Sequence, residues 1–336
     1  MRITSRVSQA DIAKRAGVTQ AAVSLILRDK ATSIPEETRR RVLDVARELG
    51  YRADPLARRL ATGRSQLLGV FTYERVFTTR HGGWYHPFLL GIEEAAERAG
   101  QDLLLFTSAA TSGPIRSIYA DGENKLRLVD AAILLGRDEI PAELEQLVAE
   151  DYPFVFIGKR FLRGGREVPN VAPGYAAASY VLGGRLILLG HRRITYVGSN
   201  PDLPATGDRL HGLRTAIPEI TAEIVPLDRI TPSFVDDLLE RQVSAVVVEG
   251  ATYAEALRAA AGKRGLRVPE DLSVAVAGVA EDEDTVGFWS GFDIPGRRIG
   301  EVAVQRLMER LDGGPATTDT IDCAERQGKS VMEARP

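Results

Sequence analysis

The side chains that most often perform catalysis or bind metal are scarce in this sequence of 336 residues. The four histidines and the single cysteine are His81, His86, His191, His211 and Cys323. Their spacing matches no metal-ligand pattern, and we find no nucleophile elbow, P-loop or dinucleotide-binding glycine motif. We therefore expect no enzymatic activity, no metal and no cofactor. One cysteine cannot form an internal disulfide and is typical of a reducing cytoplasm, where we expect a small buried thiol in a late strand.

The charges of the chain are distributed unevenly. Residues 1–64 contain 14 Lys+Arg and 7 Asp+Glu, a net charge of +7, whereas the whole chain carries −3. The remainder is therefore acidic, at −10. A basic N-terminal segment on an acidic body indicates that only this segment meets a polyanion. The alternative is an ordinary solvated terminus.

Helix start and stop signals near the N-terminus predict three short helices. They cover residues 9–16, 20–27 and 35–49. Ser8 and Asp11 have the spacing of a capping box, and Gly17 can end the first helix with a positive φ. Thr19 can cap the second helix, and Pro35 suits the first position of the third.

Small residues in this segment predict that the first two helices cross closely. Ala13, Gly17, Val18 and Val23 supply a small contact, a turn glycine and two packing residues, a pattern typical of a helix-turn-helix. The alternative is a three-helix module that serves only for packing.

From Leu67 onward, short apolar runs alternate with amphipathic stretches. The predicted strands are 67–72, 103–107, 131–135, 154–157, 194–197, 245–248 and 273–277. The predicted helices include 87–99, 141–150, 175–189, 253–264 and 295–311. This alternation predicts an α/β body of parallel sheets, and its length favours two doubly wound lobes with a ligand cleft at the carboxyl ends of the strands.

The N-terminal segment resembles the head of the lac repressor (LacI/GalR) family. The resemblance rests on the runs VSQADIAKRAGVTQAAVS (7–24), TRRRV (38–42), LGY (49–51) and PLARRLA (55–61). It implies that the second helix lies in the major groove of DNA, with Gln20, Ala21 and Leu25 at base-reading positions. Gln can pair with adenine, whereas Ala and Leu offer apolar contact. The implied backbone contacts are Thr19, Ser24 and Arg28.

The segment Asp54–Gly63 is basic, rich in Ala and Leu, and too short to be a stable isolated helix. The family resemblance implies a hinge that folds when two copies pair on DNA. Ala57 would then permit close approach in the minor groove, and Leu60 would wedge between base steps. The alternative is an ordinary linker.

The body resembles the type I periplasmic binding proteins, as the regulatory cores of the family do. The resemblance rests on GHRRI (190–194), RLHGL (209–213) and GLRVPEDLSV (265–274). It implies that Arg209 lies in the cleft and grips polar groups of a ligand, the alternative being a solvated arginine at a helix start.

The sequence departs from the family where acidic side chains would bind a sugar. Gly174-Tyr175 and Glu249-Gly250 replace the usual Asp-Asn and Asn-Asp pairs, and the third acidic position falls near Glu281. We therefore predict a different pocket made by Tyr175, Glu249 and Glu281, or a degenerate one.

The connection from Tyr73 to Pro87 is long and carries an aromatic pair. Trp84 and Tyr85 could stack on a ligand at the mouth of the pocket, or they could anchor the loop.

Together these features predict a helix-turn-helix domain (1–53), a hinge (54–64) and an effector-binding body (65–336). We place the first lobe at about 65–170 plus 293–314 and the second at about 171–292 plus 315–336. We expect a cytoplasmic repressor that binds a pseudo-palindromic operator as a homodimer or a tetramer and responds to a sugar or another polar metabolite. The alternative is a solute-binding protein. The absence of an apolar run of about 18 residues, and of a secretory leader at the N-terminus, argues against a membrane location or export.

Overall fold

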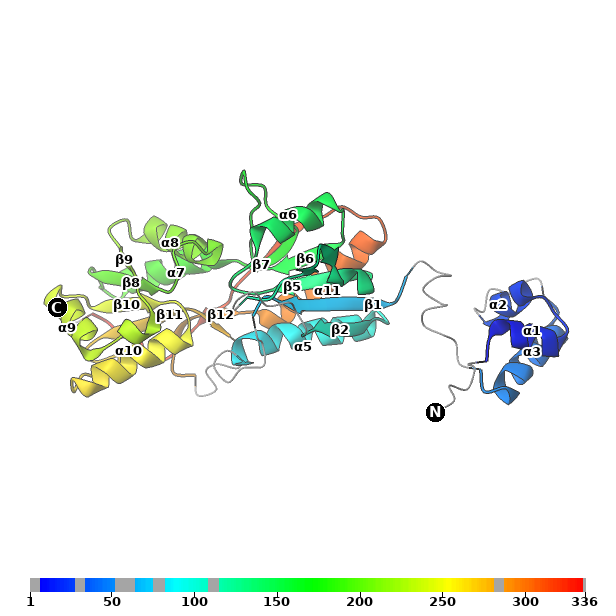
Figure 1. Ribbon diagram of the computed structural model, residues 1–336. Coiled ribbons are helices and arrows are strands. Elements are labelled where there is room, and N and C mark those ends of the chain that lie inside the picture. Colours follow the sequence, from blue (N-terminus) through cyan, green and yellow to red (C-terminus); the bar gives the residue numbers. More distant parts are fainter. Residues whose placement is uncertain are drawn as a thin grey trace, which may run out of the picture. The chain divides into compact units, whose positions relative to one another are not determined.

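The computed structural model describes residues 7–27, 34–51, 64–74, 82–107, 115–280 and 287–334. The contacts of the chain divide it into two compact units, Met1–Ser65 and Gln66–Pro336. Figure 1 labels the elements of each unit. The first unit is helical, and the second contains the parallel sheets that the alternating sequence pattern predicted.

The helical unit contains α1 (Gln9–Ala16), α2 (Gln20–Leu27) and α3 (Glu36–Glu48). The capping box is confirmed, because the backbone N–H and hydroxyl of Ser8 donate to the Asp11 carboxylate while the Ser8 hydroxyl accepts from the Asp11 N–H. Gly17 ends α1 at a φ of 65°. Pro35 lies one residue before α3, not inside it, because its backbone is extended, with ψ 139°. A small core of Ile, Ala and Val side chains from all three helices holds them together.

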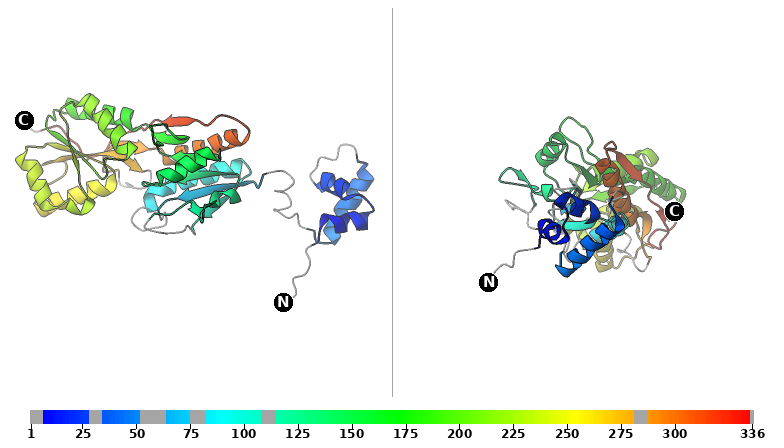
Figure 2. Two further views of the ribbon diagram at one scale, coloured as in Figure 1. Left: turned by 45° about the horizontal axis from the view of Figure 1, so that its top comes forward. Right: turned by 90° about the vertical axis from the view of Figure 1, so that its right-hand side faces the viewer.

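The first sheet of the body has the strand order β13-β7-β6-β5-β1-β2 and is parallel throughout. The bounds are β1 (Leu67–Thr72), β2 (Asp102–Phe106), β5 (Ala131–Leu135), β6 (Phe154–Ile157), β7 (Asn170–Pro173) and β13 (Thr318–Ile321). Helices α5 (Gly82–Arg98) and α11 (Gly296–Leu311) pack on one face, and α6 (Pro141–Ala149) packs on the other (Figure 2). A hairpin of β3 (Tyr119–Ala120) and β4 (Glu123–Asn124) leads into η1 (Lys125–Leu128). This layered arrangement confirms a doubly wound lobe.

The second sheet has the order β14-β12-β11-β10-β8-β9, and only β14 is antiparallel to its neighbour. The bounds are β8 (Ile194–Gly198), β9 (Thr221–Ile224), β10 (Ala245–Val248), β11 (Ser273–Ala280), β12 (Ser290–Ile294) and β14 (Glu325–Arg326). Helices α7 (Tyr175–Leu188) and α8 (Pro204–Ala216) cover one face, while η2 (Leu227–Arg229), α9 (Pro232–Glu240) and α10 (Ala251–Lys263) lie on the other side. The second lobe is therefore also doubly wound.

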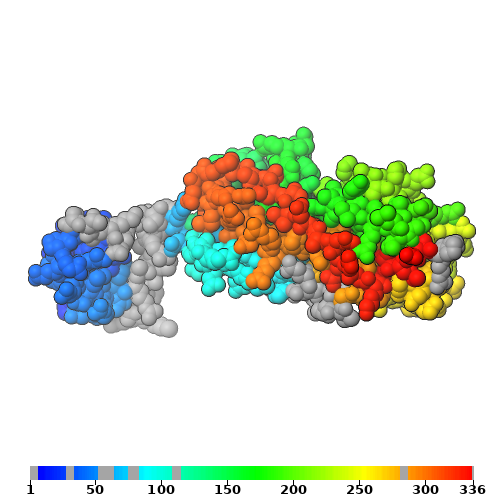
Figure 3. Space-filling model, turned by 180° about the vertical axis from the view of Figure 1, so that it is seen from behind, coloured from blue at the N-terminus to red at the C-terminus, as the bar shows by residue number. Residues whose placement is uncertain are grey.

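The chain passes between the two sheets three times, after β7, after β12 and after β13. The predicted start of the last segment of the second lobe, at residue 315, is wrong, because β13 still pairs with β7 in the first sheet. The first crossing likewise follows Pro173 rather than residue 170. These two short strands, β7 and β13, are polar or contain proline, so they lack the apolar run that predicted the other strands. The stretch after α11 lies on the surface of both lobes, where Figure 3 draws it in red.

Helices α5 and α11 of the first lobe approach each other to backbone contact. A Cβ at Gly91 would lie 1.9 Å from the Arg297 carbonyl oxygen, and one at Gly300 would lie 2.2 Å from the Phe88 carbonyl oxygen. Only glycine fits where two backbones come this close. The two helices therefore pack as one tight pair.

Within the ranges described, no helix is long and apolar enough to cross a membrane. The same ranges contain no group of three or more potential metal ligands.

Candidate functional site

Helix α2 exposes the side chains that the sequence assigned to base reading. Gln20 and Ala21 are exposed, and Leu25 is 44% exposed, whereas Val23 and Ile26 of the same helix are buried in the small core. An apolar side chain left open on so small a unit is available for contact with a partner. The base-reading roles of Gln20, Ala21 and Leu25 stay predictions that this geometry permits.

The predicted backbone contacts on α2 are also accessible. The Thr19 hydroxyl accepts a hydrogen bond from the Ala22 N–H at 3.2 Å, so Thr19 caps α2 and keeps its own O–H proton available for a phosphate. Ser24 is half-buried. Four other predicted site residues lie outside the described ranges, namely Arg28, Ala57, Leu60 and Glu281.

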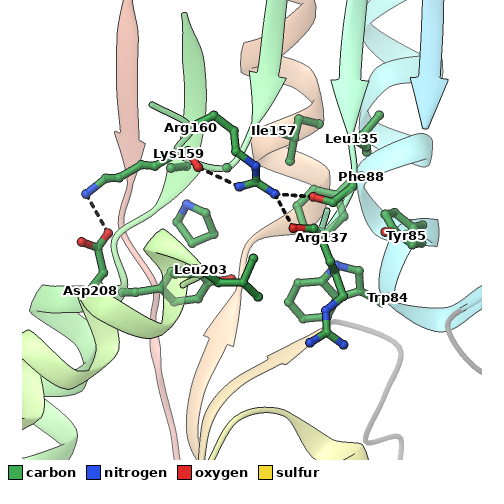
Figure 4. A pocket seen from close by; sticks show the side chains of 16 residues that line it. Trp84, Tyr85, Phe88, Leu135, Arg137, Ile157, Lys159, Arg160, Leu203 and Asp208 are labelled. Atoms are coloured by element: carbon green, nitrogen blue, oxygen red, sulfur yellow. Dashed lines mark hydrogen bonds and ion pairs between the residues drawn. The ribbon is translucent and has the colours of Figure 1, made fainter. Parts of the chain in front are cut away.

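A pocket lies between the two lobes of the body, where the carboxyl ends of β5, β6 and β7 face the first turns of α7 and α8 (Figure 4). This is the edge at which open α/β sheets bind ligands. Its lining consists of Trp84, Tyr85, Phe88, Leu135, Gly136, Arg137, Ile157, Gly158, Lys159, Arg160, Ala172, Pro173, Tyr175, Leu203, Ala205 and Asp208. The structure thus brings together three of the predicted ligand residues, Tyr175, Trp84 and Tyr85.

Trp84 and Tyr85 belong to a helix and not to a loop, which corrects the sequence prediction. Helix α5 begins at Gly82 and contains Pro87, the residue at which we expected it to start. Pro87 lies inside this helix, where it removes one i→i−4 hydrogen bond without ending the helix. Trp84 packs on Phe88 with ring centroids 5.9 Å apart, and Tyr85 is 3% exposed. The pair is therefore anchored and also lines the pocket.

Arg209 and Glu249 lie together but do not line this pocket. The Arg209 Nη1 donates to Glu249 Oε1 at 3.1 Å, and its Nε donates to the Ala277 carbonyl at 2.6 Å. The guanidinium carbon lies 3.7 Å from the centre of the Tyr175 ring, which does line the pocket. In this structure Arg209 supports Tyr175 and does not itself line the pocket, and a direct contact between Arg209 and a ligand stays a prediction.

The Glu249 carboxylate has no acceptor position left for a ligand. Its Oε1 accepts from the Thr206 hydroxyl at 2.6 Å as well as from Arg209. Its Oε2 accepts from the backbone N–H and the hydroxyl of Ser199, at 2.9 and 2.7 Å. A carboxylate accepts about four hydrogen bonds, so this set is complete. Glu249 orders the second lobe instead of offering an oxygen to a sugar.

The titration behaviour of this cluster follows from burial and charge. Burial alone would raise the pKa of Glu249, but the positive charge of Arg209 and the hydroxyl and N–H donors hold that pKa below its ordinary value. Burial raises the pKa of Tyr175 to about 12, so the phenol is neutral beside the guanidinium. Burial also raises the pKa of the Cys323 thiol to about 11. Cys323 is partly buried and lies between β13 and β14, not inside a strand as predicted.

Two polar contacts join the lobes across the pocket, and the sequence analysis missed all four of their residues. Lys159 Nζ lies 2.7 Å from Asp208 Oδ2, and Arg137 Nη2 donates to the Ser199 hydroxyl at 2.6 Å. Arg137 and Lys159 each follow a buried strand and a glycine. That repeated pattern at strand ends is the signal that could have found them.

Arg160 lines the same pocket but serves the first lobe internally. Its Nη2 donates to the carbonyls of Gly136 and Arg137 at 2.6 and 3.0 Å, and its Nη1 donates to the Lys159 carbonyl at 2.7 Å. Its Nε binds Glu139. The side chain is 6% exposed, so it fixes the loops after β5 and β6.

Each of the two units contains a segment that matches a known protein family. Residues 9–54 match the family described as bacterial regulatory proteins, lacI family, and residues 184–327 match a periplasmic binding protein-like domain. The chain is 28% identical to the HTH-type transcriptional regulator AscG of Escherichia coli (strain K12), over 90% of this chain and 92% of that one. It is 23% identical to the ribose operon repressor of Haemophilus influenzae, over 90% of this chain and 91% of that one.

Solved structures share the fold over nearly the whole length. A lac repressor dimer bound to operator and the anti-inducer ONPF matches with a TM-score of 0.74 and 18% identity, covering 97% of this chain and 99% of that chain. A complex of the transcriptional regulator CelR with cellobiose matches with a TM-score of 0.62 and 22% identity, covering 97% and 100%. With the exposed α2 face and the two-lobed body, these matches show that the chain belongs to the lacI family of bacterial regulatory proteins and is a DNA-binding transcriptional regulator.

Proposed function

We propose that this regulator is a repressor that binds a pseudo-palindromic operator as a homodimer, with one α2 helix in the major groove of each half-site. Gln20 would pair with an adenine, and Ala21 and Leu25 would contact apolar base edges such as a thymine methyl. Thr19, Ser24 and Arg28 would set the position of the helix on the phosphates. A tetramer, a pair of such dimers, is the alternative assembly.

The proposal divides the chain into a reading domain (1–53), a hinge (54–64) and a sensing body from residue 65. Ala57 and Leu60 of the hinge would enter the minor groove when two copies pair on DNA. The site of action is the cytoplasm, where the DNA of a bacterium lies.

The sensing body would bind a small polar effector between its lobes. The observation that carries this proposal is the pocket at the carboxyl ends of β5, β6 and β7, closed from the other lobe by Tyr175, Leu203 and Asp208. A ligand held on both sides favours one arrangement of the lobes over another, which is how a pocket in the body can change the operator affinity of the head. Solved structures of similar regulators contain cellobiose or ribose, so a sugar-sized effector fits the class.

The DNA-binding part is tested by selecting fragments, including DNA next to the protein's own gene, and measuring affinity by fluorescence anisotropy at two salt concentrations. We expect a salt-sensitive preference for a pseudo-palindromic fragment. Gln20→Ala should weaken binding roughly 5- to 150-fold and relax the preference at one base position. The matched control, Gln146→Ala in the body, should bind as the wild type does. Equal affinity for all fragments would exclude the proposal.

A further inference from the structure

The side chains around the inter-lobe pocket include more hydrogen-bond donors with a positive charge than acceptors with a negative charge. Among the described residues, its side-chain lining contains three cations, Arg137, Lys159 and Arg160, and one carboxylate, Asp208. A neutral sugar presents hydroxyl donors and acceptors in similar number, so a pocket built for it needs acceptors of its own. The question is which of these groups remain available to a ligand.

Each acceptor close to the pocket already makes at least one contact within the protein, although Asp208 and the carbonyls are not saturated. Asp208 binds Lys159, and the carbonyls of Gly136, Arg137 and Lys159 each accept from Arg160. Glu249, which the sequence suggested as a ligand residue, is saturated by Ser199, Thr206 and Arg209. A ligand rich in hydroxyl donors would therefore find few partners.

Donors, in contrast, remain available. The exposed guanidinium of Arg137 makes one hydrogen bond, to the neutral Ser199 hydroxyl, and no carboxylate of the described residues lies within ion-pair distance of it. The Tyr85 hydroxyl is buried and makes no hydrogen bond of normal geometry within the described residues, although the Glu74 carboxylate lies close enough to contribute to its raised pKa. Burial raises the pKa of Tyr85, so its hydroxyl keeps the proton that it can donate. A buried donor without a partner costs free energy that a bound acceptor would recover.

We propose that the effector is an anion, a small metabolite of sugar size that carries a carboxylate or a phosphate, held by Arg137 and by the Tyr85 hydroxyl. Arginine suits both groups, because its planar fork donates two parallel hydrogen bonds to two of their oxygens. Lys159 adds a second positive charge, and in this structure the Asp208 carboxylate of the other lobe neutralises it. Arg137, Tyr85 and Lys159 line one cavity (Figure 4).

The rest of the effector must present an apolar face. Trp84, Phe88, Leu135, Ile157 and Leu203 supply large apolar side chains to the remaining wall. The ring C–H face of a sugar acid or sugar phosphate would pack against such a wall while its charged group reaches Arg137. This inference rests on the proposed function of the body as a sensor and adds the charge of what it senses.

The experiment compares matched ligands by isothermal titration calorimetry on the full-length protein. The probes are glucose, glucuronate, the neutral methyl ester of glucuronic acid, and glucose 6-phosphate. We expect glucuronate or glucose 6-phosphate, or both, to bind at least about tenfold more tightly than the two neutral compounds, with an affinity that falls as salt rises. Tighter binding of glucuronate would indicate a pocket for a carboxylate, and tighter binding of glucose 6-phosphate would indicate a pocket for a phosphate.

Variants of the pocket test whether Arg137 and Tyr85 cause the preference for anions. Arg137→Gln should weaken binding of the preferred anion roughly 10- to 100-fold and leave the neutral probes unaffected. Tyr85→Phe should weaken it less, since the ring stays in place. The matched control is Arg163→Gln, an exposed arginine of the first lobe outside this pocket, which should bind as the wild type does.

The outcomes separate the inference from the proposed function. If neutral probes bind as tightly as the anions, or if Arg137→Gln still prefers anions, the inference of an anionic effector is wrong. The proposal that an effector controls operator binding is not affected by this result. If anions bind through Arg137 but leave operator affinity unchanged, the inference stands and effector control falls. If none of the four compounds binds, both fall.

Discussion

Two of the ion pairs near the inter-lobe pocket, Arg209–Glu249 and Lys159–Asp208, differ in burial and in what they join. The Arg209–Glu249 pair lies within the second lobe, with side chains 4% and 10% exposed. The Lys159–Asp208 pair joins the first lobe to the second, with side chains 28% and 25% exposed. The buried pair also uses the Ala277 carbonyl, the Thr206 and Ser199 hydroxyls and the ring of Tyr175.

This difference separates a structural pair from one that can open. Breaking a buried pair leaves one charge without solvent or partner, which is costly. A partly exposed pair exchanges its contact for water at little cost. The first pair therefore fixes one wall of the pocket, and the second can close or release the lobes at an energy that a ligand can supply.

The largest effect should come from breaking the buried pair. Glu249→Leu leaves the Arg209 guanidinium buried without its carboxylate, and we expect the free energy of unfolding, measured in urea, to fall by about 3–5 kcal/mol. The double variant Arg209→Met/Glu249→Leu should lose clearly less, because no charge is left buried.

The control for that variant is Glu255→Leu on α10, whose pair with Arg258 is half exposed on both sides. It should change the unfolding free energy by no more than about 0.5 kcal/mol. Equal losses in the single and double variants would show that the cavity, and not the orphaned charge, dominates.

Acid should weaken the same pair by a smaller amount. The pKa of Glu249 in the folded protein is below its ordinary value of 4.5, so its contribution to stability is complete above pH 4.5 and is lost as the pH falls from there through the folded pKa. Urea denaturation between pH 7 and pH 3 should show a steeper acid loss for the wild type than for Arg209→Met/Glu249→Leu. If the unfolding free energies of the two proteins fell in parallel with pH, Glu249 would not contribute to the loss of stability in acid.

The smallest change in stability should come from the bridging pair. Asp208→Asn removes one charge of a partly exposed contact, so the unfolding free energy should change by less than about 1 kcal/mol. Small-angle scattering of this variant should show a larger radius of gyration than that of the wild type, because one of the contacts between the lobes is lost. A stability loss as large as that of Glu249→Leu would contradict the distinction between the pairs.

Much of the fold could be predicted because the central strands are uninterrupted apolar runs. The predicted bounds of β1, β5, β6 and β10 agree with the structure, and all the residues of β5, β6 and β10 are buried. The short strands β7 and β13 were missed because their polar and proline residues break the apolar pattern. The start of α5 was placed too late because we took Pro87 as its first residue.

The site was predictable only in part, for a chemical reason. Family positions led to Arg209, Glu249 and Tyr175, which do form one cluster. A sequence cannot show that the Glu249 carboxylate oxygens are already hydrogen-bonded to Ser199, after β8, and to Thr206 and Arg209 of α8. Arg137 and Lys159 lie on two separate loops of the first lobe and become neighbours of one pocket only after the sheet has formed.

The close backbone contacts at Gly91 and Gly300 make α5 and α11 a rigid helix pair in the first lobe. Trp84 in the first turn of α5 borders the pocket, and toward the other end of the helix Arg98 binds Glu301 of α11 at 2.6 Å. Two backbones in direct contact at Gly91 cannot slide or bend independently, because tightly packed interiors shift as units. A push on the indole would therefore turn the helix pair as a whole and carry the movement along its length to the far end of the lobe.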